Sequence, residues 1–347
     1  MTVPFGAINP PQAHAGAATF VAAPAWACGG LIAPNGTVNL VRTTTLAGYH
    51  DGVEHYVTSF EYAGGGGRFG SIVPLPGIPS DVVRGGDWTL QRLVQEVQPP
   101  QVEAFRATAD LSAANAGAEV ILETRIDALD ITVLKGGAAD VGQWALDHGF
   151  QLPPDAPEVL EFYASRSPIF MAARFDASEA ERLGQGIGDG TPIHLSIPTQ
   201  NPWVPLRILS LGREASETVE ADVFLLTDAR PALLPRPGAT MTLERSEPAS
   251  DALLDDLRSD KGMGWIPESG MWLSYLKIDA RAEALDHDLA IDPTGLGTPS
   301  KVAAGLVLPE DVQGGARTGW AGLWAWVGAA ALVVATVAFG NRILDDR

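Results

Sequence analysis

The chain has 347 residues and a mass of 36.5 kDa, a length typical of about two domains of roughly 150 residues each. It carries 42 acidic against 23 basic side chains, a formal net charge of −19, and this shortage of Lys and Arg argues against a nucleic-acid partner. Its one cysteine, Cys28, excludes an intramolecular disulfide framework and a cysteine-based zinc site.

The N-terminal residues 1–27 have some features of a secretory signal. Residues 15–27 are small and apolar, and Ala25-Trp26-Ala27 fits the A-x-A cleavage pattern. No Lys or Arg precedes Arg42, so the basic start of a complete signal is missing. We expect residues 1–27 to be a truncated signal segment, with Cys28 as the first mature residue. Without a signal, the body would stay in the cytoplasm.

Between residues 28 and 291 the sequence predicts short strands interspersed with a few short helices. Apolar and β-branched runs predict strands at residues 38–46, 54–62, 68–75, 120–126, 131–135, 169–175, 193–197, 206–209, 219–226, 240–244 and 271–281. Helices are predicted after Asp87, after Asp140, around residues 158–164 and after Ser250, with the named residues as N-caps. The absence of regular βαβ alternation favours an α+β fold with mostly antiparallel strands.

The expected domain boundaries follow changes in composition. We expect an α+β extracytoplasmic body at residues 28–230 and a proline-rich linker at 231–237, which opens a second α/β part of the body at 231–291. A Gly-, Pro- and Thr-rich stalk is expected at 292–317, then a transmembrane helix at 318–340 and a cytoplasmic tail at 341–347.

The C-terminal segment gives the clearest indication in the sequence, which is of a membrane-spanning helix. Residues 320–339 contain no charge, and twenty helical residues span about 30 Å, the thickness of a bilayer core. Trp320, Trp324 and Trp326 are expected at the membrane interface. The segment also has small residues at helical spacing, which suit close packing against another membrane helix: Gly322, Ala325, Gly328, Ala329 and Ala330.

The flanking charges predict the orientation of that segment. Arg342 and Arg347 follow it, whereas Arg317 is the nearest basic residue before it. This excess predicts a cytoplasmic tail and a body outside the cytoplasm. The alternative is a tail-anchored protein with its body in the cytoplasm.

One cluster could hold a metal ion. Asp51-Gly52 predicts the turn of a β-hairpin, and His50, Asp51, Glu54 and His55 surround it. Two imidazoles and two carboxylates are suitable ligands for a divalent metal. The alternative is that these side chains are polar because a hairpin tip is in water.

Other candidate motifs are weaker. Residues 286–288, Asp-His-Asp, alternate with leucines and are predicted on a solvent-exposed face, and His194 stands alone in a strand-like run. The glycine-rich stretches at 64–67 and 184–190 lack the spacing of phosphate- or dinucleotide-binding loops. No G-x-S-x-G motif occurs. We therefore expect no cofactor.

Several segments together resemble a bacterial family, the domain of unknown function 2330 family. They are residues 27–30, 69–79, 130–166 and 271–277, together with the closing hydrophobic segment, and the most specific piece is WALDHGFQLPP at 144–154. The resemblance implies an exported protein, often with a C-terminal membrane helix, and it implies no activity, cofactor or catalytic residue.

The sequence therefore predicts a non-enzymatic, single-pass membrane protein whose extracytoplasmic body binds or scaffolds a partner. Its expected contacts are the lipid bilayer and other membrane proteins, as an accessory subunit of an envelope or membrane complex. The alternative is an envelope hydrolase or metal-dependent enzyme that uses the region of His50 and His55.

Overall fold

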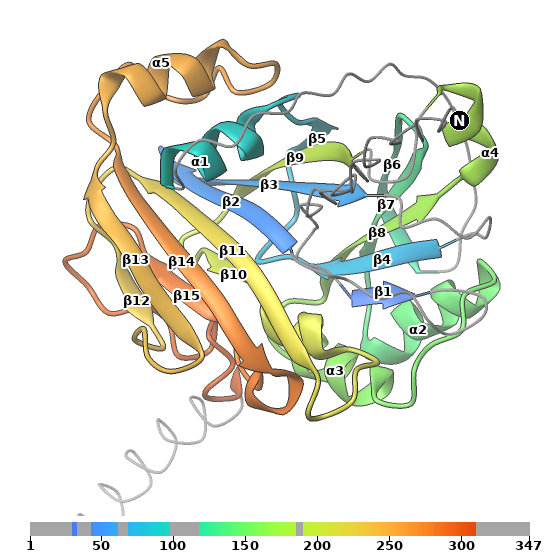
Figure 1. Cartoon of the computed structure of the whole chain (residues 1–347). Helices are drawn as coiled ribbons and strands as arrows, with labels where there is room; N and C mark the ends of the chain where they lie inside the picture. Colours follow the sequence, from blue (N-terminus) through green and yellow to red (C-terminus); the bar gives the residue numbers. More distant parts are fainter. Residues whose placement is uncertain (1–29, 33–42, 62–68, 98–117, 185–189, 310–347) are drawn as a thin grey trace, which may run out of the picture.

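The computed structural model describes residues 30–32, 43–61, 69–97, 118–184 and 190–309. Two large β-sheets lie face to face, and helices cover their outer faces (Figure 1). The fold is thus α+β with mostly antiparallel strands and few helices, as the sequence predicts.

The seven-stranded sheet has the order β13-β14-β11-β2-β3-β9-β5. Its neighbours are antiparallel except β11 and β2, which run parallel. Its strands are β2 (Thr43–His50), β3 (Val53–Glu61), β5 (Asp81–Arg84), β9 (Gly190–Pro198), β11 (Thr218–Thr227), β13 (Met241–Pro248) and β14 (Trp272–Arg281).

The five-stranded sheet is antiparallel throughout, with the order β1-β4-β8-β7-β6. Its strands are β1 (Gly30–Ile32), β4 (Phe69–Pro74), β6 (Glu119–Ile126), β7 (Leu129–Lys135) and β8 (Ile169–Phe175). A small third sheet joins β10 (Trp203–Val204), β15 (Leu289–Asp292) and β12 (Ala232–Leu234).

Alternation along the strands divides the apolar side chains among three cores, because successive side chains point to opposite faces of a sheet. The central core fills the space between the two large sheets and includes Leu195, Val223 and Met171. A second core lies under helices on the outer face of the seven-stranded sheet. A third lies under helices on the outer face of the five-stranded sheet.

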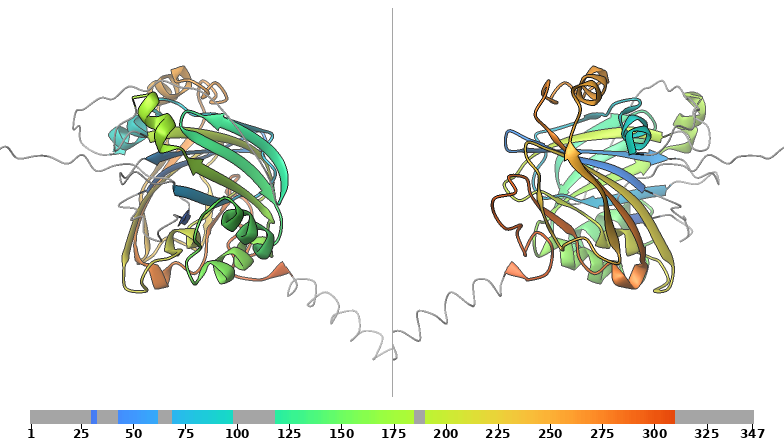
Figure 2. Two further views of the ribbon diagram at one scale, coloured as in Figure 1. Left: turned by 90° about the vertical axis from the view of Figure 1, so that its right-hand side faces the viewer. Right: turned by 60° about the vertical axis from the view of Figure 1, so that its left-hand side comes forward.

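Four of the helices form two groups at opposite ends of the molecule (Figures 1 and 2). α1 (Thr89–Val97) and α5 (Asp251–Ser259) cover the seven-stranded sheet, and α2 (Ala138–Asp147) and α3 (Ala156–Ala164) cover the five-stranded sheet. The remaining helical elements are α4 (Ala177–Arg182) and the 3₁₀ turns η1 (Arg207–Ser210) and η2 (Ala282–Ala284).

Several local predictions are confirmed. Asp51 and Gly52, with φ of 50° and 80°, form the turn between β2 and β3. The Ser250 hydroxyl accepts the backbone N–H of Leu253 and caps α5. Gly149, with φ of 83°, follows α2, as expected of a residue that must adopt a left-handed conformation.

Three local predictions are wrong. Asp140 is not the N-cap of α2, because Gly137 holds that position and Asp140 lies in the first turn, where its carboxylate accepts the Gly137 backbone N–H. Residues 206–209 lie largely in the 3₁₀ turn η1 rather than in a strand. Asp87 does not cap α1, because the carboxylate of Asp260 takes that role. It accepts the backbone N–H groups of Asp87 and Trp88 and the hydroxyl of Thr89. Asp260, far along the chain, thereby satisfies the free donors at this helix start.

The two predicted parts of the body share one sheet, because β11 lies before residue 231 and pairs along its whole length with β14. Part of the expected stalk also belongs to the body, since Ala303 and Ala304 are buried in the third core. Within the described residues no helix is long and apolar enough to cross a membrane. The expected signal, Cys28, the segment 318–340 with its tryptophans and glycines, and the tail lie outside the described residues.

Candidate functional site

A buried histidine pair lies on the outer face of the seven-stranded sheet. His55 on β3 and His194 on β9 are diagonal neighbours in the antiparallel register. Nδ1 of His55 lies 2.9 Å from Nε2 of His194, and the two side chains are only 8% and 4% exposed. This is hydrogen-bonding distance between two ring nitrogens.

Burial keeps both rings neutral. It lowers the pKa of His55 to about 3, with further contributions from His194 and His50, and it lowers the pKa of His194 to about 4. The carboxylate of Asp81 and the backbone of Gly262 act in the opposite direction on His194. At neutral pH one imidazole N–H therefore donates to the other ring, and their tautomers decide which ring is the donor.

The loop of residues 260–270 covers the pair. The indole of Trp265 stacks on His55 with 4.0 Å between ring centroids and an angle of 2° between planes. This contact requires a glycine opposite His55, because a Cβ at Gly48 would lie 2.2 Å from the indole. Met263 and Ile266, which are buried, anchor the loop in the second core.

Two nitrogen atoms of this cluster lack hydrogen bonds to the described residues. Nδ1 of His194 and Nε1 of Trp265 are both buried, and neither has a hydrogen-bond partner of normal geometry among the described residues. The Gly262 backbone is near enough to His194 to affect its pKa without reaching such geometry. A buried donor without a hydrogen bond lowers the free energy of unfolding. The cluster is therefore a polar site inside an apolar core whose hydrogen bonds are incomplete.

Glu54 is a second buried polar group. It lies on the other face of β3, between the two large sheets. Its side chain is fully buried, and Oε2 accepts the Trp203 backbone N–H at a long 3.4 Å. Oε1 has no partner within the described part of the chain. Desolvation raises the pKa of Glu54 to about 8, so the group is a neutral carboxylic acid at pH 7.

The structure does not bring the four predicted metal ligands together. His50 and His55 share a face, but His50 lies 2.6 Å from the carboxylate of Asp228. Asp51 lies at the turn, 3.5 Å from His50, and Glu54 points into the opposite core. The described residues contain no group of three or more His, Cys, Asp or Glu side chains that could hold a metal ion.

The prediction that Asp288 is exposed is wrong, because this residue is fully buried. Its carboxylate accepts the hydroxyl of Tyr163 and the backbone N–H groups of Leu206 and Arg207. It also pairs with the Arg166 guanidinium at 2.6 Å, and that guanidinium is itself 3% exposed. This buried ion pair is hydrogen-bonded on all sides and has a structural role.

The histidine pair was missed in the sequence because its members are 139 residues apart. The sequence does indicate to which face of its strand His194 points. The flanking Ile193, Leu195 and Ile197 alternate and fill the central core, so His194 had to face the other side of β9. Nothing in the sequence marks Trp265 as its neighbour, since the 260–270 loop has no periodic pattern.

The family model of an uncharacterized protein conserved in bacteria (DUF2330) matches residues 22–233, more than half of the chain. The chain belongs to this family. The matched residues include the hairpin of β2 and β3, the histidine pair and α3, but they end before α5 and the 260–270 loop. No curated protein sequence matches the chain.

Among solved structures the chain is similar to the baculovirus protein P35. The crystal structure of P35 matches with a TM-score of 0.40 and 8% identity over 75% of this chain and 98% of that chain. P35 in complex with caspase-8 matches with a TM-score of 0.33 and 8% identity over 76% of this chain and 96% of that chain. Such weak likeness gives no basis for assigning a function.

Proposed function

We propose that the protein is a single-pass, membrane-anchored protein with its body outside the cytoplasm, where it binds or scaffolds a partner as an accessory subunit of a membrane or envelope complex. The observation that carries this proposal is the uncharged stretch at residues 320–339. It has the length and composition of a membrane-spanning helix and starts soon after the last residues packed on the body.

The chemistry of the body supports a binding role over a catalytic one. Two buried carboxylates that the structure describes are engaged in structural contacts: Asp288 with Arg166, and Asp260 with the start of α1. His50, which the enzymatic alternative requires, is paired with Asp228. These groups hold the fold together.

The edges of the seven-stranded sheet are short or interrupted, which suits a soluble body. β5 has four residues, and β13 carries a register shift between Leu243 and Arg245 together with the charges of Glu244 and Glu247. Such features discourage edge-to-edge aggregation of sheets. We therefore expect the partner to contact side chains and the membrane segment rather than add a strand.

The first experiment tests the anchor. Membranes from the native host are washed with alkaline carbonate, and the protein is expected to remain in the pellet. Protease added to intact cells or spheroplasts is expected to digest the body and to spare the C-terminal tail. Release by carbonate would refute the anchor, and a body protected from external protease would refute the orientation.

A second experiment tests the accessory role. The full-length protein is purified in mild detergent, and the proteins that accompany it are identified by mass spectrometry. We expect a stoichiometric membrane partner, and we expect Gly328→Leu to weaken this association because a large side chain separates closely packed helices. Val334→Leu, in the same segment, is the control. A protein that purifies alone would refute the subunit role.

A further inference from the structure

Residues 303–305, close to the end of the described chain, are fixed to the body. The backbone N–H of Asp288 donates to the Ala304 carbonyl at 3.0 Å. The Arg166 guanidinium donates to the Ala303 carbonyl at 2.6 Å while it pairs with Asp288. One buried ion pair therefore joins the turn after α3, the residue before β15 and residues 303–304.

Close packing extends this contact to Gly305. Its φ is +72°, and a Cβ at this position would lie 2.2 Å from the ring of Phe162 on α3. The backbone thus lies directly against the aromatic ring, which only glycine allows. Beyond this contact the chain leaves the body, and Leu306 and Leu308 are each 46% exposed.

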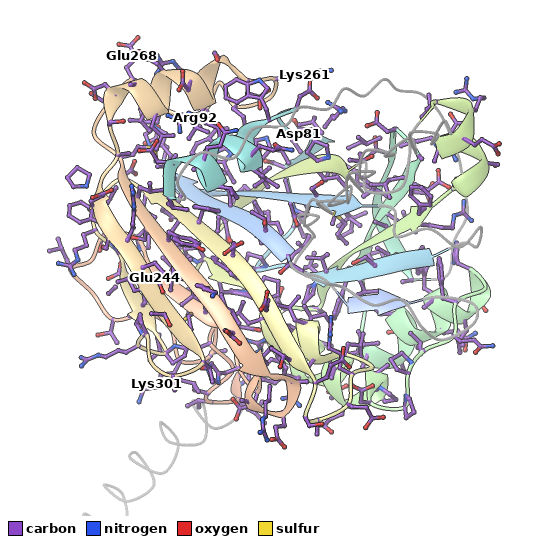
Figure 3. The ribbon with its side chains drawn as sticks, viewed as in Figure 1. Asp81, Arg92, Glu244, Lys261, Glu268 and Lys301 are labelled. Carbon is purple, nitrogen blue, oxygen red and sulfur yellow. The ribbon has the colours of Figure 1, made fainter. Side chains whose placement is uncertain are left out.

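The sequence leaves little length between this exit and the uncharged segment. Eight residues lie between Pro309 and residue 318. An extended chain reaches at most about 3.3–3.6 Å per residue, so the nine steps from residue 309 to residue 318 span roughly 30 Å at most. In an anchored protein, the point where the chain leaves the body therefore stays within about 30 Å of the bilayer. Lys301 lies at the end of the body near this exit, and Lys261 and Glu268 lie at the opposite end (Figure 3).

We propose that the surface formed by Leu306, Leu308 and the adjoining end of α3 rests on the bilayer, with the two leucines at the level of the lipid headgroups. This inference rests on the proposed membrane anchor and adds the orientation of the body. The occupant is a zwitterionic lipid surface. The chain's net charge of −19 disfavours close approach to anionic headgroups.

The orientation places the 260–270 loop and α5 at the end of the body farthest from the lipid (Figure 3). That end is then free to meet an extracytoplasmic partner. Leucines at the exit would otherwise be exposed apolar groups at the very place where the chain approaches the membrane, and apolar groups partition favourably into the interface.

The test uses the full-length protein in phosphatidylcholine vesicles, with Cys28→Ser as background. A single cysteine is introduced by Leu308→Cys or, as the control at the far end, by Glu268→Cys, and each is labelled with a fluorophore. Lipids with a nitroxide at the headgroup are then added to the vesicles. We expect a strong loss of fluorescence for the label at position 308 and none for the label at position 268.

Two failures can be told apart. Equal quenching at both positions, in protein that resists carbonate extraction, would overturn the orientation and leave the anchor intact. Extraction of the protein by carbonate would overturn the anchor itself. A further variant, Leu306→Ser with Leu308→Ser, is expected to reduce quenching of a label at Lys301→Cys, and unchanged quenching would overturn the contact of the leucines with lipid.

Discussion

The protonated Glu54 leads to a quantitative prediction about stability and pH. Its pKa is about 8 in the folded protein against an ordinary 4.5. The folded state therefore keeps a proton that the unfolded chain loses above pH 4.5, and stability falls as the pH rises from 4.5 to about 8. At 1.36 kcal/mol per pH unit, the whole window corresponds to about 5 kcal/mol.

Glu54→Gln removes this dependence, because the amide is neutral and of similar shape and can still accept the Trp203 N–H. Between pH 5 and pH 8 the wild type should lose roughly 3 kcal/mol more stability than the variant. The measurement is urea unfolding of the full-length protein in detergent at both pH values. Glu268→Gln, at an exposed position, is the control and should follow the wild type.

Equal pH dependence in the wild type and in Glu54→Gln would refute the reasoning. It would mean that Glu54 is ionised in the folded state or that water reaches its carboxyl group. The comparison with the wild type also removes contributions from other titrating groups, since these are unchanged by the substitution.

Three further predictions concern the buried contacts. The low pKa values of His55 and His194, about 3 and about 4, mean that stability present at neutral pH is lost as the pH falls from about 6.5 toward 4; His194→Gln should lessen this loss in thermal unfolding between pH 7 and pH 4, and an unchanged loss would contradict it. Asp288→Asn leaves Arg166 buried without its counter-charge, so urea unfolding should show a loss of about 3–5 kcal/mol, and a near-neutral effect would contradict the buried pair. Gly48→Ala forces the indole off His55, which should alter the near-ultraviolet circular dichroism and cost about 1–3 kcal/mol; an unaltered spectrum would disprove the contact.

Local features of the fold could be predicted from the sequence. Asp51-Gly52 specifies a tight turn, Ser250 provides a helix cap, and alternating Ile193, Leu195 and Ile197 specify one buried strand face. Each of these depends on neighbours within a few residues, so the pattern carries the information.

The candidate site could not be predicted in this way. The two strands that carry His55 and His194 meet only because of the sheet order β3-β9, and turn or periodicity signals do not determine which distant strands pair. Asp260 directly follows α5 in the sequence, yet it is buried at the start of α1. A charged side chain is expected to be exposed unless its partner is known, and here the partner lies far away in the sequence.

The pairing of β11 has a consequence for how the chain can be cut and made. β11 is paired on one side with β2, from the beginning of the body, and on the other with β14, which lies beyond the family match at residue 233. A fragment that stops at residue 233 would leave the ten residues of β11, mostly buried in the full chain, with an open backbone edge that can recruit another chain. The region matched by the family model is therefore shorter than the folded sheet, and β11 can complete its pairing only after β14, which ends at Arg281, has been synthesised.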